Sequence, residues 1–87
     1  MITIVDFYAE WCGPCKLITP ILEELVENNQ DVNLKKINVD FEESKDLVSE
    51  HSVRSIPTLL FMKDDKVLHK HVGSITKTKL EELLSTF

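Results

Sequence analysis

Residues 5–16 read Val-Asp-Phe-Tyr-Ala-Glu-Trp-Cys-Gly-Pro-Cys-Lys, an apolar run that leads directly into two cysteines separated by two residues. The run from Ile2 to Ala9 is rich in β-branched and aromatic residues and contains a single acid, Asp6. This pattern predicts a strand that is buried on both faces. From Gly13 to about Asn29, apolar residues recur in adjacent pairs every four positions, which predicts an amphipathic helix. The cysteine pair therefore lies where a buried strand passes into a helix.

The remainder of the chain predicts three more strands and two more helices. Strands are expected at 32–39, 58–62 and 66–72, and the last of these, with its Lys and His side chains outward, is expected at a sheet edge. A short helix capped by Asp40, with Glu43 three residues on, precedes the third strand, and a final helix opens at Thr76. A helix between the first two strands implies a parallel crossover, and the short turn before 66–72 implies an antiparallel hairpin. The order βαβαββα predicts an α/β fold, a four-stranded mixed sheet flanked by three helices.

The composition is that of a small globular domain. The chain has 87 residues, 43% of them hydrophobic and 29% charged, with no linker-like or repetitive segment, so residues 1–87 are expected to form one domain. The net charge is -5, so the chain is not expected to have the basic surface that binding to nucleic acids or anionic membranes requires. No apolar run is long enough to span a membrane, and no basic region precedes the first apolar stretch, so a cytoplasmic location is expected.

Cys12 and Cys15 are predicted to be a redox pair. Two cysteines are too few for the disulfide framework of a small secreted domain, and their spacing excludes a long-range crosslink. The free N–H groups and the positive dipole end at a helix start favour a thiolate at Cys12, which is therefore the expected nucleophile. Cys15, one turn further into the helix, is the expected resolving thiol, which attacks a mixed disulfide at Cys12.

A zinc site is the main alternative for two cysteines at this spacing. It is disfavoured because the chain has no second such pair and because His51, His69 and His71 match no ligand spacing. These three histidines are expected to be solvated side chains. The sequence therefore predicts no metal, and nothing in it indicates another cofactor.

Three segments of the chain resemble the thioredoxin family. They are Trp11 to Lys16, which contains both cysteines, the preceding Val5 to Glu10, and the later Ser55 to Thr58, which reads Ser-Ile-Pro-Thr. The similarity runs from Met1 to Phe87 and implies a thioredoxin-like fold.

The resemblance also implies substrate-binding roles. Pro57 resembles the family's cis-proline, beside which the backbone of Ile56 pairs with an extended substrate segment. Trp11 matches the tryptophan that covers the site, and Gly73 matches a glycine beside the substrate groove. The expected substrate-binding residues are Trp11, Gly13, Pro14, Ile56, Pro57 and Gly73.

Asp6 resembles the family's buried carboxylate behind the cysteine pair, and Lys36 resembles the lysine that neighbours it. The chemistry of an acid in an apolar central strand agrees, because lost hydration is expected to raise the pKa of Asp6 and to let it exchange a proton with Cys15 near neutral pH. The alternatives are an exposed acid on an edge strand for Asp6 and a solvated strand lysine for Lys36.

The chain also departs from the family pattern. The family's usual first strand and first helix have no counterpart, so the strand at 32–39 is expected at a sheet edge. The short helix near Leu47 is then expected to cover its face of the sheet alone or to leave apolar surface exposed. Many members of the family carry glycine where this chain has Ser52 and Ser55. The family's usual hairpin turn also contains glycine, whereas this chain has Asp64-Asp65 there.

The resemblance implies a protein that reduces disulfides in other proteins and is itself re-reduced by a thioredoxin-reductase-like flavoprotein. A monomer is expected, because the net charge of -5 opposes self-association, and a dimer paired through the strand at 32–39 is the alternative. Gly13-Pro14 between the cysteines favours this activity over a glutaredoxin-like reductase that draws electrons from glutathione. The chain offers no obvious cationic clamp for glutathione carboxylates beyond Lys16, Lys36 and Arg54. A binding subunit that uses the fold without redox chemistry is the alternative from another class.

Overall fold

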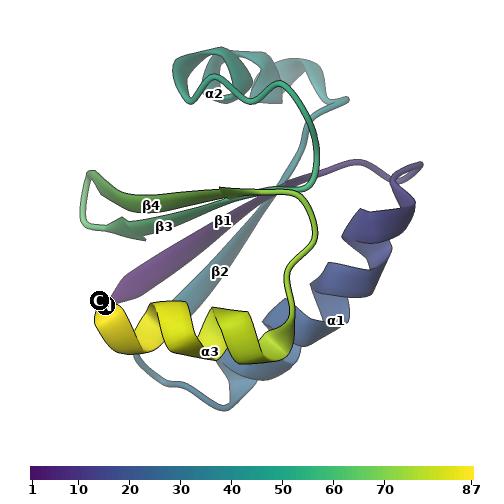
Figure 1. The fold of residues 1–87 in the computed structure, drawn as a ribbon. Coiled ribbons are helices and arrows are strands. Elements are labelled where there is room, and N and C mark those ends of the chain that lie inside the picture. The colour runs from purple at the N-terminus through teal and green to yellow at the C-terminus, as the bar shows by residue number, and fades with distance from the viewer.

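The computed structural model describes residues 1–87 and contains four strands, three α-helices and one 3-10 helix. Their bounds are β1 Ile2–Tyr8, α1 Gly13–Glu27, β2 Val32–Asn38, η1 Glu42–Ser44, α2 Lys45–Glu50, β3 Thr58–Lys63, β4 Lys66–Val72 and α3 Lys77–Thr86. The strands lie in the order β2-β1-β3-β4, with β1 parallel to β2 and antiparallel to β3, and with β3 antiparallel to β4. Figure 1 shows α1 and α3 on one face of the sheet and α2 on the other. The predicted order βαβαββα and the mixed four-stranded sheet are confirmed.

The sheet separates two hydrophobic clusters, and β1 contributes to both because its side chains alternate between the two faces. Ile4 packs with α1 and α3, whereas Val5 and Phe7 pack beneath α2. Asp6 shares the face of Ile4, so the single acid of β1 lies in the layer beneath α1 and α3. The larger cluster contains Ile4, Ile18, Leu22, Leu25, Val32, Leu59, Phe61, Ile75 and Leu80, and the smaller one Val5, Phe7, Ile37 and Leu60.

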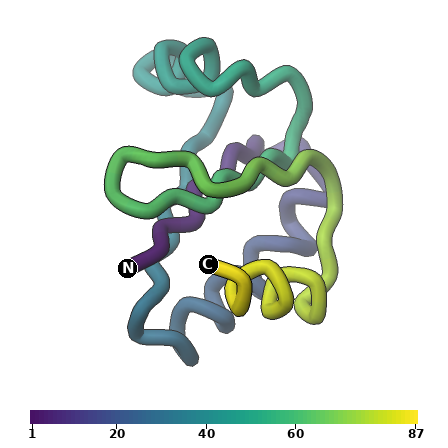
Figure 2. The backbone as a smooth tube through the Cα atoms, turned by 60° about the vertical axis from the view of Figure 1, so that its left-hand side comes forward, coloured from purple at the N-terminus to yellow at the C-terminus, as the bar shows by residue number.

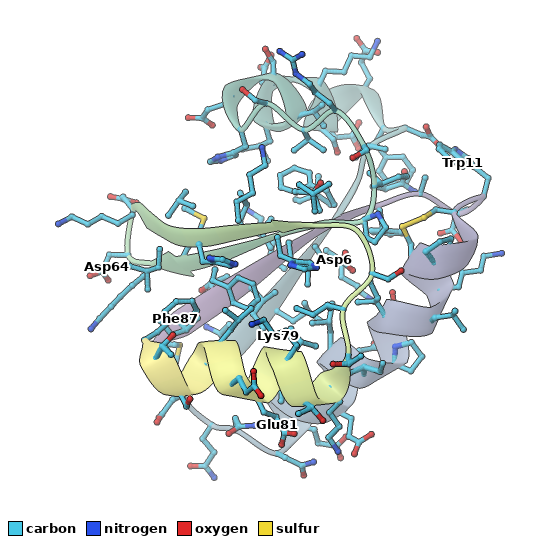
Figure 3. The ribbon with its side chains drawn as sticks, in the orientation of Figure 1. Asp6, Trp11, Asp64, Lys79, Glu81 and Phe87 are labelled. Atoms are coloured by element: carbon cyan, nitrogen blue, oxygen red, sulfur yellow. A yellow bond between two sulfur atoms is a disulfide. The ribbon has the colours of Figure 1, made fainter.

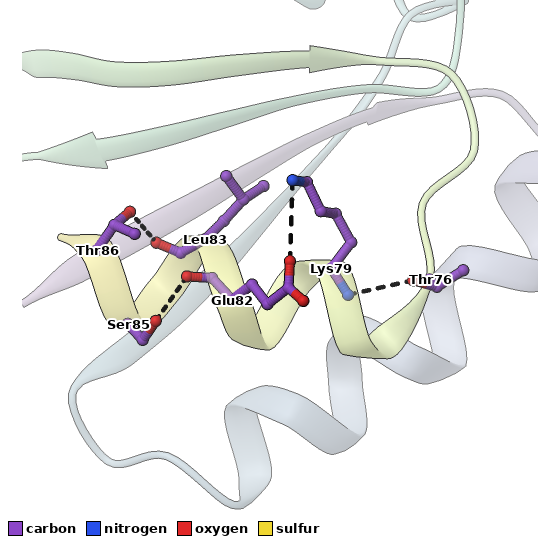
Figure 4. Close-up of polar contacts among 6 residues, drawn as sticks. All are labelled: Thr76, Lys79, Glu82, Leu83, Ser85 and Thr86. Atoms are coloured by element: carbon purple, nitrogen blue, oxygen red, sulfur yellow. Dashed lines mark hydrogen bonds and ion pairs between the residues drawn. The ribbon is translucent and has the colours of Figure 1, made fainter.

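Local hydrogen bonds fix both ends of α3 (Figure 4). The hydroxyl of Thr76 accepts a hydrogen bond from the backbone N–H of Lys79 at 3.1 Å, so Thr76 is the N-cap and the helix opens there, as predicted. Near the other end, the hydroxyls of Ser85 and Thr86 each donate to a carbonyl oxygen of the preceding turn at 2.7 Å. None of the helices combines the length and the apolar character needed to cross a membrane.

Asp40 does not cap the short helix, so that prediction is wrong. The segment begins with η1 and continues into α2, and neither helix has a side-chain hydrogen bond at its cap. Asp40 instead accepts a hydrogen bond from the indole of Trp11. The spacing of Asp40 and Glu43 resembles a capping box, but the carboxylate finds a donor from a distant part of the chain.

The prediction that the histidines are solvated side chains is also wrong. β4 is an edge strand, as expected, but directly opposite residues of an antiparallel pair share a face, and His69 and His71 lie opposite Phe61 and Leu59 of the larger cluster. Both are half-buried, and the ring of His69 lies 5.8 Å from that of Phe61 and 6.4 Å from that of Phe87. His51 at the end of α2 is half-buried as well.

β2 forms the other edge of the sheet, as predicted. Lys35 and Lys36 lie exposed along it, and charged side chains at an edge oppose pairing with another chain. Although α2 has only six residues, it keeps Val5 and Phe7 buried and leaves a cavity of about 400 Å³ beside them.

Two turns adopt the left-handed backbone conformation that glycine favours. Ser52 has a φ of 53° and Asp64 a φ of 55°, at positions where glycine is the residue expected for such a turn. Ser55, the other serine in the segment between α2 and β3, does not have a positive φ. The segment between α2 and β3 therefore begins near Ser52, whose side chain makes the left-handed conformation unfavourable.

Candidate active site

The chain between β1 and α1 places Cys12 and Cys15 at the N-terminus of α1, where they form a disulfide (Figure 3). Cys12 is the N-cap with an extended backbone, and its Sγ accepts a hydrogen bond from the backbone N–H of Cys15 at 3.2 Å. Pro14 stands in the first turn, where its fixed φ and missing N–H suit a helix start. Both cysteines are buried, with 4% of Cys12 and 1% of Cys15 exposed. The Sγ of Cys12 thus already receives an N–H that favours a thiolate.

The segment before β3 packs against the disulfide. Ile56 lies against the small cluster that the two cysteines form with Ala9, and the Ile56–Pro57 peptide bond is cis, as the resemblance implied. The carbonyl oxygen of Pro57 accepts a hydrogen bond from the N–H of Gly73 at 2.9 Å. Gly73 has a φ of 95°, which glycine adopts without steric cost. Residues that are far apart in the sequence thus meet at the disulfide.

Trp11 is an exposed aromatic side chain with a fixed orientation. The residue is 70% exposed, and its Nε1 donates a hydrogen bond to Oδ2 of Asp40 at 2.8 Å. The bond joins the segment before α1 to the segment after β2. Asp40 is therefore a site residue that the sequence did not reveal, because its partner lies 29 residues away and no local pattern connects them.

An apolar groove begins beside Trp11. It has a volume of about 530 Å³, and Val39, Val53 and Ile56 supply much of its apolar wall. Arg54 is the one charged residue that lines it. The groove is lined by Trp11, Val39, Val48, Val53, Arg54, Ser55 and Ile56. Val39 and Ile56 also pack against the cluster that contains the two cysteines, so the groove lies next to the disulfide.

Asp6 is a buried carboxylate without a hydrogen-bond partner. Its residue is 1% exposed, and neither of its carboxylate oxygens has a donor. Burial raises the pKa of Asp6 from 3.8 to about 6, although the positive charge of Lys36 offsets part of the rise. Figure 3 shows the side chain between the sheet and the helices of the larger cluster. The carboxyl group can therefore take up or release a proton close to neutral pH.

Lys36 lies opposite Asp6 in the register of β1 and β2, but the two side chains are not hydrogen-bonded. The ammonium of Lys36 instead pairs with the carboxylate of Glu23 on α1 at 3.5 Å. Lys36 also lines a surface pocket of about 280 Å³, together with Cys15 and Thr19. Lys36 therefore acts on Asp6 through its charge rather than by direct contact.

The site offers a dithiol or disulfide and a titratable acid, but no ligand set for a metal ion. No group of three or more His, Cys, Asp or Glu side chains is placed to hold one. The chemistry that the arrangement supports is exchange between the Cys12–Cys15 pair and another disulfide.

Comparison with known proteins identifies the family. The sequence profile of the thioredoxin family matches residues 1–86. The chain belongs to the thioredoxin family. The thioredoxins of Mycoplasmoides gallisepticum and Bacillus subtilis are 46% and 43% identical to it, over 81 and 84 residues. These alignments cover 93% and 97% of this chain, and 79% and 80% of the two relatives.

Solved structures of thioredoxins share the fold. The oxidized form of mitochondrial thioredoxin 3 from Saccharomyces cerevisiae superposes with a TM-score of 0.85 at 37% identity, covering 99% of this chain and 78% of the other. A mutant thioredoxin from Halobacterium salinarum superposes with a TM-score of 0.90 at 36% identity, covering 99% and 74%. With its redox-active Cys12–Cys15 pair, the protein is a thiol-disulfide oxidoreductase of the thioredoxin type.

Proposed function

We propose that Cys12 is the attacking thiol and Cys15 the resolving thiol in the reduction of disulfides in other proteins. The observation that carries this assignment is the position of the two sulfurs on α1. Cys12 is the N-cap, and its Sγ accepts the backbone N–H of Cys15, so the helix end favours a thiolate there. Cys15 lies one turn deeper, is 1% exposed and lines a surface pocket that it shares with Lys36.

The exchange transfers two electrons from the protein to its target. The Cys12 thiolate attacks one sulfur of the target disulfide, forming a Cys12–target bond and releasing the other sulfur as a thiolate that takes up a proton. Cys15 then loses its proton and attacks Sγ of Cys12, which breaks the mixed disulfide and releases the second target thiol. The target is reduced to a dithiol, and Cys12 and Cys15 are oxidised to the disulfide.

Asp6 is proposed to accept the proton that Cys15 loses. Its carboxylate has no hydrogen-bond donor of its own, and its pKa of about 6 leaves it mostly ionised at neutral pH. Lys36 is proposed to assist by keeping the pKa of Asp6 from rising further. The support is the burial of Asp6 and the charge of Lys36 opposite it in the sheet.

The proposed substrate is an extended segment of a protein that carries a disulfide. Trp11 and Ile56 line the groove, while Gly13 and Pro14 form the helix start beside it. Pro57, which follows Ile56 in the chain, and Gly73 are joined by a hydrogen bond, and the backbone of Ile56 is proposed to pair with the substrate. Apolar walls of this kind accept many sequences, because they provide contact area without demanding a particular partner for every polar group.

The finer biological setting is proposed as well. The proposed electron donor is a flavoprotein of the thioredoxin-reductase type. The proposed location is the cytoplasm, and the proposed oligomeric state is a monomer. A compartment that keeps thiols reduced suits a dithiol that must be regenerated after every turnover. The net charge of -5 opposes self-association.

Two measurements test these proposals. Cys15→Ser is expected to trap target proteins as mixed disulfides on non-reducing gels, whereas Cys12→Ser traps none, and equal trapping by both variants would contradict the assignment. Insulin reduction is then measured with NADPH and thioredoxin reductase, and in parallel with glutathione and its reductase. Turnover that depends on glutathione alone would replace the proposed donor with a glutaredoxin-type one.

A further inference from the structure

The wall of the groove between α2 and β3 is held by few hydrogen bonds. Figure 1 shows this segment descending on the side of the molecule where α1 begins. The N–H of Val53 donates to Val48 at 2.9 Å, and the carbonyl oxygen of Ser55 accepts from the hydroxyl of Thr58 at 2.7 Å. Between these points, no backbone hydrogen bond holds Arg54. The wall is therefore held by the packing of Val53 and Ile56 and by the turn through which the chain leaves α2.

The exit from α2 takes a conformation that its sequence disfavours. His51 is the C-cap of α2, and Ser52 follows with a φ of 53°. A side chain makes this left-handed conformation unfavourable, so a non-glycine residue persists there only when its surroundings hold it. The last carbonyl groups of a helix also lack donors within the helix.

Lys70 on β4 supplies the missing donors. Its Nζ donates to the carbonyl oxygen of His51 at 3.0 Å and to that of Ser52 at 3.2 Å. Hydrogen bonds from a charged donor are stronger than neutral ones, and a lysine complements the negative end of a helix dipole. One side chain on the edge strand thus bridges both carbonyl groups at the turn that begins the groove wall.

We infer that Lys70 is a positioning residue for protein substrates: its ammonium holds the turn at His51 and Ser52, and thereby the Val53–Ile56 wall of the groove beside the disulfide. The inference rests on the proposed function, because it takes the groove as the place where the target segment lies. Lys70 is not among the residues that line the groove, so it acts through the wall rather than by contact.

The matched control is on the same strand. Lys66 is also exposed on β4, but it makes no side-chain hydrogen bond or ion pair, so Lys66→Met removes an equal charge without touching the turn. Lys70→Met removes the ammonium and keeps an unbranched apolar side chain as long as the stem of lysine. Lys70→Arg keeps a charged donor that can reach both carbonyl groups.

The experiment compares a protein substrate with a small one, for each variant. Lys70→Met is expected to raise the KM for insulin about fivefold to tenfold with kcat within twofold, and to reduce a small aryl disulfide at the wild-type rate. Lys66→Met is expected to match the wild type on both substrates, and Lys70→Arg to restore most of the KM for insulin. If Lys70→Met does not fold, Lys70→Gln is measured in the same way.

Three results would overturn the inference: an unchanged KM for insulin in Lys70→Met, an equal loss on both substrates, or an equal effect of Lys66→Met. The wild type serves as the test of the underlying function. Wild-type protein that reduces the aryl disulfide but not insulin contradicts the proposed protein substrate and the role of Lys70 together. Wild-type protein that reduces insulin, with Lys70→Met unchanged, contradicts the role of Lys70 alone.

Discussion

Replacing Asp6 by Asn is expected to make the stability of the oxidised protein less sensitive to pH. Burial raises the pKa of this carboxyl group from 3.8 to about 6, so the unfolded chain gives up the proton before the folded chain does. The folded state is therefore destabilised progressively as pH rises from about 4 to above 6, and the full penalty remains at higher pH. At 1.36 kcal/mol per pKa unit, the difference between the two pKa values corresponds to a loss of about 3 kcal/mol in the free energy of unfolding.

Urea denaturation of wild type and Asp6→Asn at pH 4 and pH 8 measures this penalty. The advantage of the Asn variant is expected to grow by roughly 2 to 3 kcal/mol between the two pH values, since part of the penalty is already present at pH 4. A fixed cost of burying an amide without partners affects both pH values equally and cancels in the difference. Asp31→Asn, at an exposed position, is the control and is expected to show almost no such growth. If the advantage of Asp6→Asn grew by less than about 0.5 kcal/mol, burial of an ionisable Asp6 would be refuted.

Three further predictions concern a helix cap, the tryptophan and the sheet edge. Thr76→Ala is expected to lower the free energy of unfolding by about 1 kcal/mol in urea titrations, because the N–H of Lys79 loses its acceptor, and an unchanged midpoint would contradict the cap. Asp40→Ala is expected to lower the fluorescence anisotropy of Trp11, the single tryptophan, because the indole loses its hydrogen bond, and anisotropy equal to that of the wild type would mean that other contacts hold the ring. Light scattering is expected to give the mass of a monomer, 10.0 kDa, and alternate backbone amides of β2 are expected to exchange hydrogen quickly because β2 is an edge strand. Uniform protection of these amides in a monomer would show that the edge is covered.

The parts of the fold that follow from local patterns could be predicted from the sequence. The apolar run of β1, the four-residue repeat of α1 and the polar turn before β4 each reflect a periodicity that is visible within ten to fifteen residues. The burial of Asp6 could also be predicted, because both faces of a strand buried on both sides are covered by other elements. The cysteine pair at a strand-to-helix junction indicated the chemistry in the same local way.

The contacts that could not be predicted join distant parts of the chain. Asp40 has the spacing of a helix cap, and only the folded arrangement shows that the Trp11 indole is the donor that reaches it. His69 reads as an outward residue by alternation, but its place opposite Phe61 follows from the pairing of β3 with β4. The bridge from Lys70 to the end of α2 likewise depends on how an edge strand lies beside a helix on one face of the sheet.

The two ends of the chain lie close together, as Figures 1 and 2 show from different directions. Met1 and Phe87 line the same cavity, and the ring of Phe87 packs on that of Phe61 at 5.5 Å. Because β1 runs from this end of the sheet to the disulfide at the opposite end, a protein fused to either terminus is attached on the side away from the reactive cysteines. A short linker between the termini can also close the chain into a ring, so that new ends cut at an exposed turn such as Asp64 give a circular permutant with the same redox face.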